Sequence, residues 1–165
     1  MHASSLRDAC EERLGRLSLP HRFGEAQLID AVAAAVGRKI VCEAIDMRSA
    51  FACGLRKRYS DREVIYYEKN ASPLHQRQII AHELAHILCD HKGDVDLNDV
   101  MSDDELADLM DWSVLGVSAR TSYETEEEIE AETTATLILQ LMYRGAVLPA
   151  SRPREADERW DALFA

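Results

Sequence analysis

The chain has few basic residues for its size, and this shortage restricts its partners. It carries 19 Lys and Arg against 30 Asp and Glu, which gives a net charge of -11. A surface this acidic repels phosphate backbones, so we expect no direct binding to nucleic acid. A basic or DNA-binding protein remains compatible with this charge as a partner.

Long apolar runs are also missing. The longest apolar stretch, residues 133–142, contains Gln140 and is far shorter than the roughly 20 residues needed to cross a bilayer. Residues 1–12 are polar and mixed in charge, unlike a signal peptide. The four cysteines include no CxxC pair, which favours small buried thiols in a reducing compartment. We therefore expect a cytoplasmic location and no membrane partner.

What the chain does contain suits one globular domain. Its 165 residues are 47% hydrophobic and 30% charged, enough to build a hydrophobic core. We divide the chain into N-terminal helices over residues 1–37, a core over 38–145 and a C-terminal extension over 146–165.

Hydrophobic periodicity and turn signals predict an α+β arrangement. Ser72 followed by Pro73 indicates the start of a helix, because Ser caps helices and Pro suits the first helical position. We expect a small antiparallel sheet or hairpin packed on this helix. The predicted elements are helices over 4–17 and 25–36, a strand over 39–46, a hairpin of 53–59 and 62–69, and helices over 72–91, 103–111 and 124–144.

The helix over residues 72–91 contains the motif H-E-x-x-H, formed by His82, Glu83 and His86. Two histidines four positions apart lie on one helix face and can bind the same zinc ion. The glutamate between them can act as general base toward a water at the metal. An accidental pair of histidines on a polar face is the alternative, and the helical context argues against it.

A catalytic zinc usually takes a third protein ligand. The metzincin spacing would require histidine at the position of Lys92, so we look instead to a glutamate of the later helix. Glu128 shares a face with Ala131 and Ala135, whose small side chains allow close approach to the metal helix. We predict Glu128 as the third ligand, with Glu130 as the alternative.

Further residues complete the predicted site. Glu132 lies four positions after Glu128 and suits an acceptor that holds the ring N–H of a ligating histidine. Tyr123, His91 and Tyr143 are candidate donors to the oxyanion of the reaction. The strand over 62–69 is expected to provide the edge along which an extended substrate pairs.

Two segments resemble the ImmA/IrrE family of zinc metallo-endopeptidases. Members carry H-E-L-G-H followed by apolar residues, and later a helix of the type E-x-x-A-[ND]-x-F-A. Residues 78–91 match the first motif, with Ala85 in place of the usual Gly. Glu128, Ala131 and Ala135 match the second, whereas Glu132 and Thr134 depart from it.

The resemblance implies a zincin-like α+β core with Zn²⁺ as cofactor and a glutamate as third ligand. It further implies a cytoplasmic zinc endopeptidase acting on a regulatory protein, such as a helix-turn-helix repressor. The departures leave an alternative open, in which a catalytically silent protein uses zinc for stability. Such a protein would bind a partner, or be the toxin-like component of a two-protein regulatory system.

Overall fold

The computed structural model describes residues 3–46, 54–91 and 126–144. These residues form helices and strands close to the predicted bounds. The predicted helix over 103–111 and the extension over 146–165 lie outside the described residues. In chain order the elements are α1 (Ala3–Gly15), α2 (Glu25–Val36), β1 (Lys39–Ile45), β2 (Gly54–Arg58), β3 (Arg62–Glu68), α3 (Pro73–Leu88) and α7 (Glu126–Tyr143).

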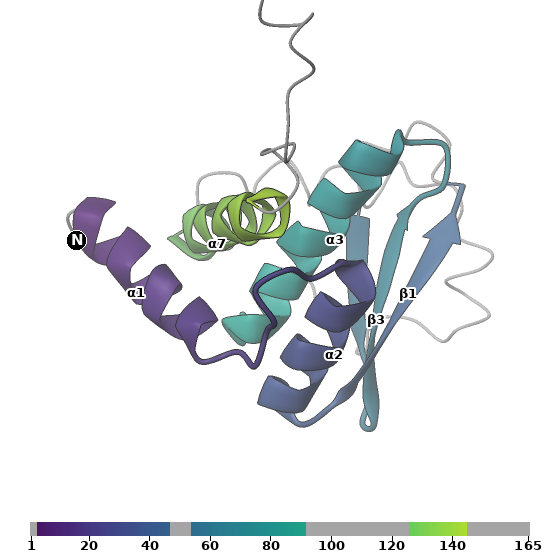
Figure 1. Ribbon diagram of the computed structural model, residues 1–165. Helices are drawn as coiled ribbons and strands as arrows, with labels where there is room; N and C mark the ends of the chain where they lie inside the picture. The colour runs from purple at the N-terminus through teal and green to yellow at the C-terminus, as the bar shows by residue number, and fades with distance from the viewer. Residues whose placement is uncertain (1–2, 47–53, 92–125, 145–165) are drawn as a thin grey trace, which may run out of the picture.

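Helix α3 is the middle layer of the described fold. Helices α2 and α3 lie against the sheet, α7 packs on α3, and α1 packs on α7 (Figure 1). Every layer contributes a side chain that is less than 2% exposed, namely Cys10, Leu28, Ile65, Leu84 and Ile138. The fold class is α+β, as predicted, and is consistent with a zincin-like domain. Within the described residues no helix has the length and apolar character of a membrane span.

The three strands form a mixed sheet in the order β1-β3-β2. The predicted hairpin is confirmed, because β2 and β3 are antiparallel and place Lys57 opposite Val64. The expectation of an antiparallel sheet or hairpin holds for β2 and β3 but not for β1, which runs parallel to β3 with Cys42 opposite Ile65. β3 takes the central place because Val64 and Ile65 are both buried, and a central strand is covered on both sides.

The central position of β3 changes the expected place of a substrate. Both edges of β3 are already paired, so the strand over 62–69 has no free edge for an extended peptide. The prediction that a substrate pairs with this strand is therefore wrong. Among the described strands, β1 and β2 are the edges.

The start of α3 follows the predicted capping. The Ser72 hydroxyl accepts a hydrogen bond from the backbone N–H of His75 at 3.3 Å, and Pro73 is the first helical residue. This arrangement satisfies one of the free N–H groups at the helix start, and Pro has no N–H that needs a partner.

The end of α3 falls at Leu88, earlier than the predicted end near His91. Asp90 has a left-handed backbone with φ of 54°. Its N–H donates to the carbonyl of Ile87 at 3.1 Å, and the N–H of His91 donates to the carbonyl of His86 at 3.0 Å. These two bonds form a Schellman motif, in which Asp occupies the position usually taken by Gly. The motif turns the chain so that His91 returns toward the helix.

Arginines of β2 hold this turn in place. Arg58 pairs with the Asp90 carboxylate at 3.0 Å and with Glu63 of β3 at 2.7 Å. Arg56 donates from Nη2 to the carbonyl of His91 at 2.6 Å. Glu63 is 0% exposed and also pairs with Arg38 at 2.9 Å. Both guanidinium groups contact its Oε1, while its Oε2 is buried without a hydrogen-bond partner among the described residues. The end of α3 is thereby tied to the sheet.

We expect Gly54→Ala to reduce the free energy of unfolding by about 1–3 kcal/mol, because a side chain at this place overpacks the interior. A Cβ atom on Gly54 would lie 2.5 Å from Cγ2 of Ile79 and 2.9 Å from Oε1 of Glu83. Gly15→Ala is the matched control, because a Cβ there meets nothing within 4 Å. Denaturant unfolding of both variants measures the difference. Equal stability of the two variants would contradict the close approach of β2 to α3.

Candidate metal centre

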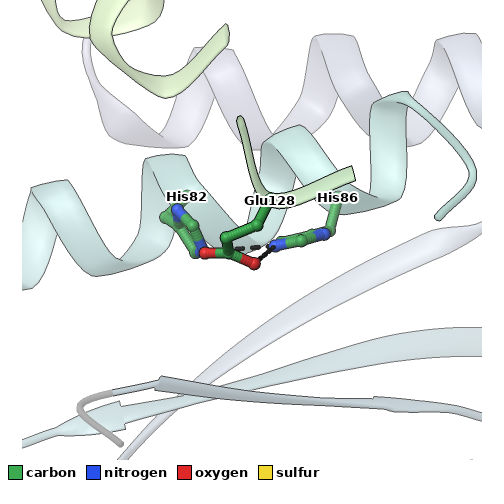
Figure 2. Close-up of side chains that lie close together, drawn as sticks. All are labelled: His82, His86 and Glu128. Carbon is green, nitrogen blue, oxygen red and sulfur yellow. Dashed lines mark hydrogen bonds and ion pairs between the residues drawn. The ribbon is translucent and has the colours of Figure 1, made fainter. Parts of the chain in front are cut away.

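Side chains from α3 and α7 converge at one point. His82 and His86 project from successive turns of α3, and the Glu128 carboxylate of α7 lies between their rings (Figure 2). Oε1 of Glu128 is 2.9 Å from Nε2 of His82, and Oε2 is 3.4 Å from Nε2 of His86. The two Nε2 atoms are 3.1 Å apart. The structure therefore brings together the three residues that were predicted as metal ligands.

This donor set has the size and chemistry of a zinc site. Ligand atoms 2.0–2.1 Å from a tetrahedral zinc lie roughly 3.3 Å from one another, close to the separations seen here. Two imidazoles and a carboxylate are the ligands of a catalytic centre that keeps a fourth position for water or substrate. The residues present thus fit a zinc ion.

The charges of the site favour a cation. Hydrogen bonds from His82 and His86 lower the pKa of Glu128 to about 2, although burial opposes this shift. Burial opposes protonation of His82, but the hydrogen bond to Glu128 and the charges of Glu83, Glu128 and Glu132 outweigh it and raise the His82 pKa. Glu128 is therefore an anion, and without a metal His82 retains a proton more readily than a free imidazole. A zinc ion would replace that proton as the partner of the carboxylate.

Glu132 lies on the other side of the His82 ring. Its Oε2 is 3.4 Å from Nδ1 of His82, while Nε2 of the same ring faces Glu128. A carboxylate at Nδ1 favours the tautomer that carries its proton there and leaves Nε2 free as a ligand. Glu132 thus lies at the ring nitrogen that its predicted role requires, and the role itself stays a prediction.

Glu83 is placed differently from the other carboxylates of the site. Within the part of the chain that the structure describes, no group donates a hydrogen bond to it, and its side chain approaches Gly54 of β2. The Arg56 guanidinium acts on Glu83 through its charge, and burial lowers the pKa of Arg56. Glu83 therefore keeps its oxygens available as acceptors for a water proton.

Arg56 is a residue of this region that the sequence analysis did not identify. Its Nη1 is buried and has no hydrogen-bond partner among the described residues. An arginine in an edge strand carries no motif, so its approach to Glu83 becomes visible only when β2 is placed beside α3.

His91 and Tyr143, two of the candidate oxyanion donors, lie in different parts of the structure. His91 is buried behind His86, with its Nδ1 at 3.0 Å from Nδ1 of His86, on the side of that ring away from Glu128. The Tyr143 hydroxyl accepts a hydrogen bond from Arg77 at 3.2 Å. It lies about four helical turns, roughly 20 Å, beyond Glu128 along α7, so the structure does not bring it to the site. Tyr123 lies outside the described residues.

A second cluster of ligand-type residues, Cys89, His91 and Glu130, lies beside the first. Arg13 of α1 donates to Oε1 of Glu130 at 2.6 Å and to Sγ of Cys89 at 3.0 Å, so a guanidinium already supplies the cation. Burial raises the pKa of Cys89 to about 11, which keeps its thiol protonated and a poor ligand. Glu130, the alternative third ligand, is engaged here and not with the two motif histidines.

Comparison with known proteins gives one family match. The family model Peptidase_M78, described as an IrrE N-terminal-like domain, matches residues 47–107. This range includes β2, β3 and all of α3, and it ends before α7. The predicted resemblance to ImmA/IrrE-type peptidases is confirmed over this segment, and the match supports a peptidase. Searches of curated proteins and of solved structures gave no significant match.

We expect purified protein to bind one zinc ion per chain, and Glu128→Gln to weaken this binding by at least tenfold, because a neutral amide replaces an anionic ligand. Glu127→Gln is the matched control, since Glu127 is exposed on the same turn of α7. Metal analysis and competition with a chromophoric chelator measure stoichiometry and affinity. Equal affinities of the two variants would remove Glu128 from the ligand set.

Proposed function

We propose that this protein is a cytoplasmic zinc-dependent endopeptidase that acts on a regulatory protein partner of the repressor type. The observation that carries the proposal is the convergence of the H-E-x-x-H histidines with Glu128, beside a glutamate that no described group engages by a hydrogen bond. The peptidase family match over residues 47–107 supports the same function.

The residues of the chain divide the chemistry among them. His82, His86 and Glu128 would hold zinc, which when bound polarises a substrate carbonyl and acidifies water. Glu83 accepts the proton from the attacking water and later delivers it to the leaving amine. Arg56 provides positive charge near Glu83. Removal of the proton by Glu83 is thus the step that this chain contributes directly.

The edge of β2 is the place where we expect an extended substrate. The N–H of Tyr59 donates to the carbonyl of Arg62 at 2.8 Å, so this pair closes the hairpin with hydrogen bonds toward β3. Antiparallel pairs alternate, so the N–H groups of Leu55 and Lys57 point toward β3. The backbone N–H groups of Arg56 and Arg58 then point away from β3, toward the open edge of β2. Gly54, next on this edge, lies against Glu83, which would bring a bound peptide to the site.

The partner is proposed from charge and from the family resemblance together. A net charge of -11 favours encounter with a basic protein and disfavours binding to DNA itself. A DNA-binding repressor carries such a basic surface. An effect on transcription would then pass through cleavage of this partner.

Glu83→Gln should retain the fold and zinc binding but lose hydrolysis by about 10²–10⁴-fold or more, because an amide cannot accept the water proton. Mass spectrometry of a candidate repressor incubated with each protein measures cleavage, and metal analysis checks that the variant is loaded. Cleavage by Glu83→Gln at the wild-type rate would refute the mechanism. If zinc-loaded wild type binds the repressor without cleaving it, the silent partner-binding function replaces the proposal.

Binding along β2 should be visible in amide hydrogen exchange. We expect a peptide that the wild type cleaves, bound to Glu83→Gln, to slow exchange of the Arg56 and Arg58 amides, because these would donate to the peptide. The Leu55 and Lys57 amides serve as internal controls, since they are already bonded to β3. Unchanged exchange at Arg56 and Arg58 in a saturated complex would place the substrate elsewhere.

A further inference from the structure

His91 uses both nitrogens of its buried ring. Its Nδ1 is 3.0 Å from Nδ1 of His86, and its Nε2 is 3.0 Å from Oε2 of Glu130. The other oxygen of Glu130 accepts from Arg13 at 2.6 Å. A continuous line of polar contacts thus runs from a metal-ligand histidine of α3, through the turn after this helix and through α7, to α1.

The chemistry of these groups determines which atom donates and which accepts in each hydrogen bond of this line. A carboxylate that is paired with a guanidinium offers only acceptors, so Nε2 of His91 must carry a proton toward Glu130. In a neutral imidazole the other nitrogen is then an acceptor. Nδ1 of His91 therefore accepts the Nδ1–H of His86. When a metal ion replaces the hydrogen bond from His86 to Glu128, Nε2 of His86 would offer it a lone pair while Nδ1 keeps its proton toward His91.

We propose that His91 is a positioning residue, which fixes the tautomer and the ring orientation of His86 through its contact with Glu130. This inference rests on the zinc centre of the proposed function. His91 would act at Nδ1 of His86, on the side of the ring that faces away from Glu128. A hydrogen bond at this position of a ligating histidine raises its affinity for metal.

The backbone of His91 is fixed as firmly as its ring. Its N–H caps α3 at the carbonyl of His86, at 3.0 Å, and its carbonyl accepts from Arg56 at 2.6 Å. Asp90 reaches the left-handed conformation that this turn needs, and Arg58 holds its carboxylate. A ring supported in this way can impose its geometry on a neighbour instead of adapting to it.

The same cluster could be interpreted as a second metal site, since Cys89, His91 and Glu130 have suitable side chains. Arg13 argues against this interpretation, because its guanidinium contacts both Cys89 and Glu130. A metal ion and a guanidinium cannot share this place without strong repulsion. The positioning role therefore predicts one zinc per chain, and a second metal site predicts two.

The first test compares His91→Leu with His91→Asn. Leucine removes both polar contacts, and we expect it to weaken zinc binding by 10–100-fold, the usual effect of losing such a partner. The Oδ1 of asparagine takes the place of Nδ1 and can accept from His86, so His91→Asn should recover part of this loss. Competition with a chromophoric chelator measures the affinities, and circular dichroism checks the fold.

The second test observes the tautomer itself. In ¹⁵N-labelled, zinc-loaded protein, His86 should show a protonated Nδ1 with a slowly exchanging proton. This proton signal should disappear or exchange rapidly in His91→Leu and persist in His91→Asn. A role of His91 in packing alone would not distinguish the two variants in this way.

The third test changes the far end of the line. In Glu130→Gln the amide can donate to Nε2 of His91 and permit the opposite tautomer, so zinc affinity should fall. Arg13→Met should lower the affinity as well, because Arg13 helps to lower the pKa of Glu130, and a Glu130 that takes up a proton can donate to His91 as the glutamine amide does. The controls are Glu127→Gln and Arg16→Met, which change an exposed residue of α7 and an exposed residue directly after α1.

The outcomes separate this inference from the proposed function. One zinc per chain, with weaker binding in His91→Leu and Glu130→Gln but not in the controls, supports the positioning role. If folded His91→Leu binds zinc as tightly as the wild type and keeps the His86 proton signal, the positioning role is overturned and the zinc centre remains supported. A wild-type protein that binds no zinc overturns both, and binding of two zinc ions assigns the cluster to a metal.

Discussion

The contact between α3 and α7 is the constraint on which the site depends. Two histidines of one helix cannot complete a catalytic metal centre, and the third donor comes from far along the chain. Packing of α7 on α3 delivers Glu128 between the two rings (Figure 2). The small residues Ala85, Ala131 and Ala135 are all buried in the common core, which lets these helices approach closely. Affinity for a metal is therefore tied to the core packing of the two helices.

Around this contact the buried charges are arranged in complementary pairs. Glu63 is placed between Arg38 and Arg58, and Glu130 between Arg13 and His91. Buried carboxylates without such partners would cost several kcal/mol each. The carboxylate of Glu83 is the exception, because no described group donates a hydrogen bond to it. Cations hold Glu63 and Glu130, whereas the half-buried carboxylate of Glu83 stays available, which matches the requirement for a general base.

Much of this arrangement could be predicted from local sequence signals. Ser72 and Pro73 gave the start of α3, the spacing of His82 and His86 gave a shared face, and helical phasing placed Glu128 with the buried alanines. These signals act within one or two helical turns and so can be seen in the sequence. The sheet order could not be predicted in this way, because the pairing of β1 with β3 depends on which strand the core covers.

The polar contacts behind the proposed metal ligands could not be predicted from the sequence for a related reason. Arg13, Arg56 and His91 come from three separate segments and meet only after the helices and the sheet have packed. The end of α3 was also misplaced, since Asp90 stands where Gly usually marks a left-handed helix end. That single backbone angle decides whether His91 continues along the helix or returns to His86.

Arg13 connects the N-terminal helix α1, through Glu130 and His91, to the proposed metal ligand His86. If docking of α1 strengthens zinc binding through Glu130, then zinc binding must strengthen the docking of α1 by the same factor, because coupling between two equilibria is reciprocal. A protein that bound α1 and drew it away from α7 would compete with the metal without approaching it. Conversely, zinc supply would set how readily that helix can be taken from its place.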